Sequence, residues 1–154
     1  MDWLNKRVEE SPYKLAMIGG IVISIIATTF MAGIQSWFPE SGTEGLEAVD
    51  RLLSGDLAPA FILFFAIAIV SPILEELIFR KFLWWISSFL FEQVETLFII
   101  SILFVMLHGS LFLAIGLLPI SFFVGWLRMK TGSIKHSIVA HAANNIAATL
   151  FFLL

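Results

Sequence analysis

The sequence predicts an all-α fold: a polytopic transmembrane helical bundle with about five spans of roughly 20 residues and short interfacial helices. Three observations predict it. Of the 154 residues, 59% are hydrophobic and only 14% are charged, and the mean hydropathy is +0.96. These values exceed those of soluble domains, so the chain is expected to be an integral membrane protein.

Long apolar runs give the expected spans. Residues 15–38 carry no charge and are followed by Pro39, which favours a retained helix over a cleaved signal peptide. Residues 58–79 form the second span, and Ser71-Pro72 should kink or break it because proline removes a backbone donor. The remaining spans are expected at residues 96–112, 114–127 and 134–154.

Two short helices are expected between the spans. Residues 39–57 are acidic, with apolar residues at helical spacing, which predicts a surface helix. Residues 82–91 are too short to cross a bilayer, and the adjacent Trp84 and Trp85 are typical of the membrane interface. We therefore divide the chain into residues 1–57, a transmembrane helix with an extracytoplasmic surface helix, and residues 58–154, the core.

Charge placement predicts the orientation and excludes some functions. When the expected spans alternate in direction across the membrane, eight of the nine Lys and Arg residues fall on one side. That side should be cytoplasmic, together with the N-terminus. These residues are Lys6, Arg7, Lys14, Arg80, Lys81, Arg128, Lys130 and Lys135. The sequence contains no cluster of basic residues interleaved with aromatic ones, so nothing in it indicates nucleic-acid binding. The chain has no cysteine, which excludes disulfides and thiolate metal sites.

Ionisable residues inside the apolar runs are the candidate functional residues. Glu75-Glu76, His108 and His141 are flanked by apolar residues, and such groups are costly in a bilayer and usually functional. Helical rise places Glu75 about 8 Å, His141 about 12 Å and His108 about 18 Å inward from one face. We therefore expect one site, accessible from the cytoplasmic side.

Helical spacing assigns different roles to the two glutamates. Glu76 and Arg80 are four residues apart, in the order that favours an ion pair. Adjacent side chains point about 100° apart, so Glu75 should lie on a separate face and should not share a pocket with Glu76. On the same spacing, His108 shares a stripe with Phe104, and His141 shares one with Asn145.

These residues carry a resemblance to a known family. Glu75-Glu76-Leu77-Ile78-Phe79-Arg80 resembles the EExxxR motif of the CAAX prenyl protease and bacteriocin-processing (CPBP, or Abi) intramembrane proteases. Phe104 to His108 resembles its FxxxH motif, and His141 to Asn145 its HxxxN motif. The resemblance covers the family's catalytic core, over roughly residues 58–154. It departs in having Lys81 where many members have Gly, and only one expected span before the core.

The resemblance implies an intramembrane endopeptidase that hydrolyses peptide bonds of membrane-associated proteins or peptides. The type II CAAX prenyl protease of this family removes a C-terminal tripeptide from prenylated proteins. Chemically, Glu75 can act as general base on a water that His108 helps to hold, and His141 and Asn145 can donate to the oxyanion. We favour this mechanism without a cofactor.

Zinc is the alternative cofactor, with Glu75, His108 and His141 as its three ligands, although HExxH is absent. Two other functions compete with proteolysis: a non-enzymatic membrane immunity or regulatory protein of the same family, and a small transporter subunit that uses these residues as a proton relay. The expected partners are membrane lipid and a membrane-associated protein or peptide substrate. The sequence does not indicate the substrate, the oligomeric state or whether the chain is complete.

Overall fold

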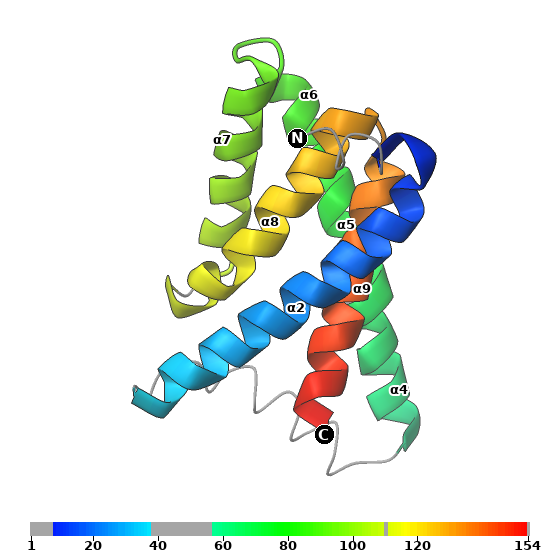
Figure 1. Ribbon diagram of the computed structural model, residues 1–154, viewed down its shortest axis with the longest axis vertical. Coiled ribbons are helices and arrows are strands. Elements are labelled where there is room, and N and C mark those ends of the chain that lie inside the picture. The colour runs from blue at the N-terminus through cyan, green and yellow to red at the C-terminus, as the bar shows by residue number, and fades with distance from the viewer. Residues whose placement is uncertain (1–7, 38–56, 110, 154) are drawn as a thin grey trace.

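The protein is a bundle of helices (Figure 1). The computed structural model describes residues 8–37, 57–109 and 111–153. In these ranges the main elements are α2 (Pro12–Trp37), a long interrupted helix, α7 (Gln93–Met106), α8 (Leu111–Thr131) and α9 (Ile134–Leu153). The long helix consists of α4 (Leu57–Phe65), the π-helical segment η1 (Ala66–Val70), α5 (Ser71–Glu76), the π-helical segment η2 (Leu77–Leu83) and α6 (Trp84–Ser87). The predicted all-α architecture is confirmed.

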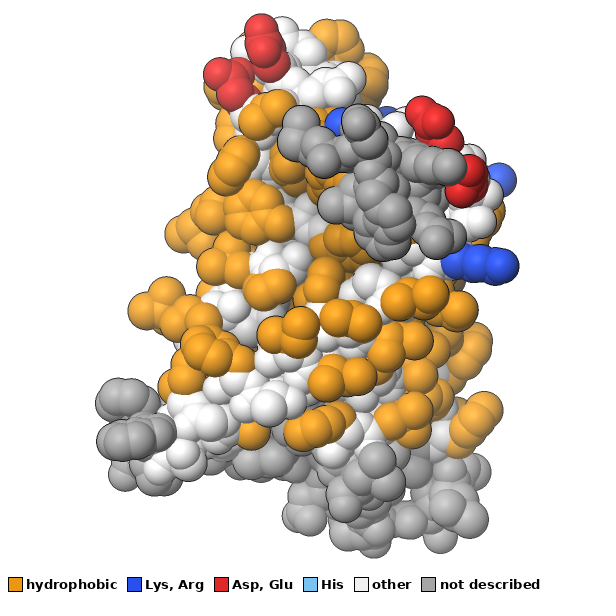
Figure 2. All heavy atoms as spheres, viewed as in Figure 1, with side chains coloured by type: hydrophobic (Ala, Val, Ile, Leu, Met, Phe, Trp, Pro, Cys, Tyr) orange, Lys and Arg blue, Asp and Glu red, His pale blue; other side chains and the backbone are white. Residues whose placement is uncertain are grey.

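Three of the described helices are long and apolar enough to cross a membrane: Pro12–Ser36, Phe61–Ser87 and Leu111–Thr131. α7 has 14 residues and is about 21 Å long, shorter than the ~30 Å hydrocarbon core of a bilayer. α9 is a continuous helix of 20 residues whose sequence includes the polar residues His136, His141, Asn144 and Asn145. Hydrophobic side chains cover the middle of the visible surface (Figure 2), as a membrane protein requires. The chain is an integral membrane protein.

The long helix differs from the prediction at Pro72. The sequence predicts a kink or break there, whereas the helix continues through α5 to Ser87. In the preceding π turn Ser71 N–H donates to Ala66 O, so the same register would pair residue 72 with Ile67 O. Pro72 has no N–H to donate, and the side-chain amide of Asn145 supplies the missing donor, with Nδ2 3.1 Å from Ile67 O. A contact from another helix therefore keeps this helix intact.

The prediction of a separate interfacial helix at residues 82–91 is wrong. The long helix runs to Ser87 and ends in a turn. Trp84 is 6% exposed and belongs to the core, whereas Trp85 is 58% exposed. The two tryptophans therefore lie on different faces of one helix, Trp84 on the buried face and Trp85 on the exposed face. The surface helix predicted for residues 39–57 lies outside the described residues, apart from Leu57.

The observed ends of α7 and α8 also differ from the predicted boundaries of the third and fourth spans. α7 ends at Met106, before the predicted limit at residue 112, and Gly109 in the following turn has a φ of 75°. α8 extends the predicted fourth span at both ends, to Leu111 and Thr131. Gly132, with a φ of 68°, then reverses the chain, and α9 begins at Ile134 as predicted.

α8 lies between two apolar clusters that form the core. The first joins the end of the long helix to α7 and comprises Phe79, Trp84, Leu97, Ile100, Phe104 and Val105, with partly buried residues of α8 packed against it. The second joins α8 to α2 and α9 and comprises Ala16, Ile120, Val124, Leu127 and Ala140. The first cluster fixes the position of the α5 and η2 residues that enter the site.

Small residues bring α2 close to α9, which it crosses in Figure 1. Ala16, Gly20 and Ser24 lie four residues apart on one face of α2, and Ala16 and Ser24 are buried. A methyl group at Gly20 would lie 2.2 Å from the backbone oxygen of Ala140 on α9. Such close backbone approach is the usual means of packing helices in membranes.

Gly20→Ala is therefore expected to destabilise the protein by about 3 kcal/mol, because the helices must separate to admit the methyl group. Thermal unfolding in detergent micelles measures the effect. Gly33→Ala on the same helix is the matched control, since a methyl group there would meet nothing within 4 Å and alanine favours helix. Equal unfolding temperatures for the two variants would contradict the packing described here.

Candidate active site

A buried ion pair lies at the centre of the bundle. Glu76 Oε1 at the end of α5 is 3.3 Å from Arg80 Nη1 in η2, and both side chains are 0% exposed. The four-residue spacing in the sequence predicts this pair, and the structure contains it. Burying two charges is costly unless further hydrogen bonds compensate, so the surroundings of both groups matter.

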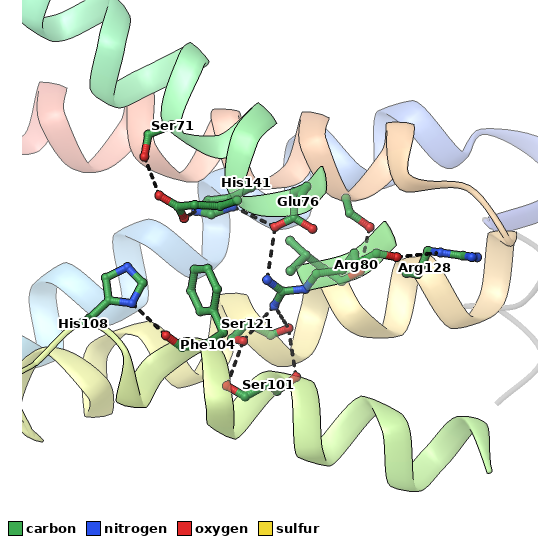
Figure 3. A network of polar contacts seen from close by, with 12 residues as sticks. Ser71, Glu76, Arg80, Ser101, Phe104, His108, Ser121, Arg128 and His141 are labelled. Carbon is green, nitrogen blue, oxygen red and sulfur yellow. Dashed lines mark hydrogen bonds and ion pairs between the residues drawn. The ribbon is translucent and has the colours of Figure 1, made fainter. Parts of the chain in front are cut away.

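Arg80 is anchored to two further helices (Figure 3). Its Nη2 donates to the backbone oxygen and to the hydroxyl of Ser121 on α8, at 2.9 and 2.8 Å. The hydroxyl of Ser101 on α7 donates to the backbone oxygen of Ser121 at 3.2 Å. The guanidinium carbon lies 4.6 Å from the ring centroid of Phe104, a cation–π contact. Arg80 therefore holds Glu76 in a fixed relation to α7 and α8.

His141 of α9 contacts both glutamates. Its Nδ1 is 2.9 Å from Glu76 Oε1, and its Nε2 is 3.6 Å from Glu75 Oε2. The expectation that the two carboxylates cannot share a site is therefore wrong. Their backbone positions do diverge, but both side chains are long enough to approach one imidazole at its two different nitrogens.

The Glu76 contact defines how His141 is protonated. A carboxylate paired with Arg80 accepts hydrogen bonds, so Nδ1 of His141 carries the proton that lies between them. Nε2 is then the nitrogen directed at Glu75. Glu76 and Arg80 thus orient the imidazole, in the way that a buried carboxylate orients a catalytic histidine.

Glu75 is the more accessible of the two carboxylates. Its side chain is 25% exposed, against 0% for Glu76. Ser71, one turn earlier in α5, donates its hydroxyl to Glu75 Oε1. The other oxygen, Oε2, faces His141. Sequence reasoning missed Ser71, although its four-residue spacing from Glu75 is a signal that could have found it.

Asn145 lies one turn beyond His141 on α9 and also faces the long helix. Its Nδ2 donates to Ile67 O, and its Oδ1 accepts from Asn144 Nδ2 at 3.3 Å. Polar contacts thus join α9 to the long helix at two places: Asn145 contacts η1, and His141 contacts α5. The second N–H of the Asn145 amide is not used by either hydrogen bond.

His108 lies apart from the other predicted site residues. It follows the end of α7 in an exposed turn, and its Nδ1 donates to Phe104 O at 2.8 Å. Within the described ranges no hydrogen bond or ion pair joins it to Glu75 or His141. The Phe104 ring contacts both imidazoles, with centroid separations of 4.7 Å to His108 and 5.6 Å to His141. The predicted meeting of all three groups is therefore only partly realised.

The arrangement does not fit the zinc set considered from the sequence. The parts of the chain that the structure describes contain no group of three or more His, Asp or Glu residues that could hold a metal ion. Glu75 and His141 approach each other, whereas His108 is separated from them by Phe104. We therefore derive no chemical step through a metal.

The chain matches the model of a known protein family. The family model described as type II CAAX prenyl endopeptidase Rce1-like matches residues 57–147. The chain belongs to the type II CAAX prenyl endopeptidase Rce1-like family. The match contains the long helix, α7, α8 and the part of α9 that carries His141 and Asn145. No curated protein and no solved structure matches the chain.

Membership in the Rce1-like family supports a protease function and agrees with the resemblance read from the three motifs. Two residues of the network, Ser101 and Ser121, had no signal in the sequence. They lie on different helices and act through a backbone oxygen as well as their hydroxyls, so only the packing of α7 on α8 brings them to Arg80.

Proposed function

We propose that this Rce1-like protein is an intramembrane endopeptidase that hydrolyses peptide bonds of membrane-associated proteins or peptides, with Glu75 as the base that activates water. One observation carries the proposal: His141 lies between two carboxylates of which only Glu75 is accessible. The charge of Glu76 is already balanced by Arg80. Glu75 is therefore the carboxylate that is free to exchange a proton with water.

The spacing between Glu75 and His141 suits an intervening water. The 3.6 Å that separates Oε2 from Nε2 is longer than a hydrogen bond. A water placed about 2.8 Å from both atoms would bridge them. Glu75 takes a proton from this water, and the resulting hydroxide attacks the carbonyl carbon of the scissile peptide bond.

The remaining steps return the proton. Attack converts the carbonyl oxygen to an oxyanion, and the proposed donors to it are the second N–H of Asn145 and His141, acting as an imidazolium that carries a proton on Nε2 as well as on Nδ1. When the intermediate collapses, the C–N bond breaks, and Glu75 gives its proton to the leaving amine. The Glu75 carboxylate is then regenerated, and the products are a carboxylic acid and an amine.

His108 is proposed to act from the other side of Phe104. Its Nδ1 is held by Phe104 O, which leaves Nε2 free at an exposed position. A peptide that contacts the exposed His108 and the partly exposed Glu75 can meet both groups without contact between the two side chains. The role of His108 in holding substrate or water therefore depends on substrate being bound.

Asn145→Ala is expected to lower kcat by roughly 10²-fold, because an oxyanion donor is lost. Steady-state cleavage of a membrane peptide by the purified protein measures it. Asn144→Ala is the matched control, since it removes a neighbouring amide that is bonded only to Asn145, and it should retain most of the activity. A loss of thermal stability in Asn145→Ala that is absent in Asn144→Ala would indicate that the contact of Asn145 with Ile67 O, and not an oxyanion, accounts for the lost activity.

The test of the proposed function is cleavage of a library of membrane peptides by the purified protein in lipid vesicles, followed by mass spectrometry of the products. Cleavage by the wild type that is absent in Glu75→Gln supports the proposal. A chelator arm addresses the mechanism: activity that survives chelation favours the glutamate route, and activity that is lost and then restored by zinc overturns it. No cleavage of any peptide would contradict the protease function itself.

The proposed orientation places the N-terminus and the site entrance on the cytoplasmic side. Contacts bring the basic ends of the helices together: the rings of Tyr13 and His136 are in tilted contact with centroids 4.4 Å apart, and Arg128 Nε donates to Arg80 O at 3.1 Å. In Figure 2, acidic side chains lie over the α6–α7 turn, and acidic and basic side chains lie together near the beginning of α2. Clustered Lys and Arg favour the cytoplasmic side.

A further inference from the structure

Three threonine hydroxyls in the helices of this protein donate back to the carbonyl four residues earlier. Thr28 donates to Ser24 O at 2.7 Å, Thr131 to Leu127 O at 2.7 Å and Thr149 to Asn145 O at 2.8 Å. This is the ordinary behaviour of Ser and Thr within helices, because the carbonyl four residues back is the nearest acceptor. It satisfies the hydroxyl and involves no other side chain.

Ser71 departs from this pattern. The carbonyl four residues before it is Ile67 O, which already accepts the Asn145 amide because Pro72 cannot supply a backbone donor. The Ser71 hydroxyl turns forward instead and donates to Glu75 Oε1. Two polar contacts thus lie at this turn of the long helix: Asn145 donates to Ile67 O, and Ser71 donates to Glu75.

We propose that Ser71 is a positioning residue that fixes the carboxylate of Glu75 so that Oε2 faces His141. A glutamate side chain has three rotatable bonds, and a donor on one oxygen restricts where the other can point. Here the donor holds Oε1, and Oε2 lies 3.6 Å from His141 Nε2. The catalytic consequence of this hydrogen bond rests on the proposed function, whereas the hydrogen bond itself does not.

Kinetics test the catalytic consequence. Ser71→Ala should lower kcat about tenfold, the effect expected for losing one hydrogen bond to a charged group. KM should stay unchanged because Ser71 does not touch the substrate. Ser71→Thr keeps a hydroxyl and should restore most of the rate. The control is Ser88→Ala, whose hydroxyl donates only to Trp85 O, and it should leave kcat unchanged.

Chemical labelling tests the hydrogen bond without any activity. Dicyclohexylcarbodiimide reacts with protonated carboxyl groups in apolar surroundings, and a carboxylate that loses a donor is more readily protonated. Ser71→Ala in detergent should therefore be labelled at Glu75 severalfold faster than wild type, as measured by peptide mass spectrometry. Glu76 is fully buried and should not react, and Glu75→Gln should remove the labelling.

The two arms separate the possible failures. Equal labelling rates in wild type and Ser71→Ala would overturn the positioning role, as would a raised KM with unchanged kcat, which would place Ser71 at the substrate. A wild type that cleaves no peptide would reject the proposed function, and the labelling rates would still decide whether Ser71 fixes Glu75. Thermal unfolding of each variant establishes that a loss of activity does not reflect a loss of fold.

Discussion

Replacing Glu75 by Gln is expected to lower kcat for peptide cleavage by about 10³–10⁴-fold, the contribution of a general base. Gln is nearly isosteric with Glu and still offers an oxygen to the Ser71 hydroxyl, so the local packing should persist. It cannot take a proton from water. KM should change little, because the substitution removes the chemistry and leaves the substrate contacts. Initial rates on a peptide that the wild type cleaves measure the effect.

Glu95→Gln is the matched control. Glu95 is exposed at the beginning of α7, where its side chain accepts a hydrogen bond from Glu92 N at 3.0 Å, and Gln can serve in the same capping role. This variant should be as active as wild type. Undiminished cleavage by Glu75→Gln would rule out the mechanism. A non-enzymatic partner-binding protein would keep its affinity in both variants.

Local spacing in the sequence predicted the parts of the site that lie within one helix. Glu76 and Arg80 are four residues apart, and they form the ion pair that this spacing favours. His141 and Asn145 share a face of α9 for the same reason, and both point toward the long helix. The depth estimate also placed Glu75 and His141 correctly near each other, because helical rise is nearly constant.

Contacts between helices could not be predicted in this way. Proline normally interrupts a helix, but Asn145 donates to Ile67 O, 78 residues away along the chain, and so supplies the donor that Pro72 lacks. The separation of Glu75 from Glu76 failed as a prediction because spacing describes where side chains leave the backbone and not where their ends converge. The exposed position of His108 follows from the early end of α7, a boundary that the apolar sequence does not mark.

The buried network also implies the largest stability effect. Arg80→Met is expected to destabilise the protein by about 3–5 kcal/mol, because it leaves the carboxylate of Glu76 buried without its countercharge. The Ser121 groups would lose their guanidinium donor as well. Within the described residues, Glu76 Oε2 already has no hydrogen-bond partner, so without Arg80 the carboxylate would keep only the contact of Oε1 with His141. Unfolding in detergent measures the loss, and Lys81→Met, at the exposed neighbouring position, should shift stability by less than about 0.5 kcal/mol.

A double variant separates the charge effect from the loss of the arginine's packing. Glu76→Gln combined with Arg80→Met removes both charges and should recover a large part of the stability lost in Arg80→Met, since no uncompensated charge is then buried. It should not recover activity, because His141 would no longer be oriented by a carboxylate at Nδ1. If the double variant were as unstable as Arg80→Met, the contacts of Arg80 with Ser121 and Phe104, and not its charge, would account for the stability of the site.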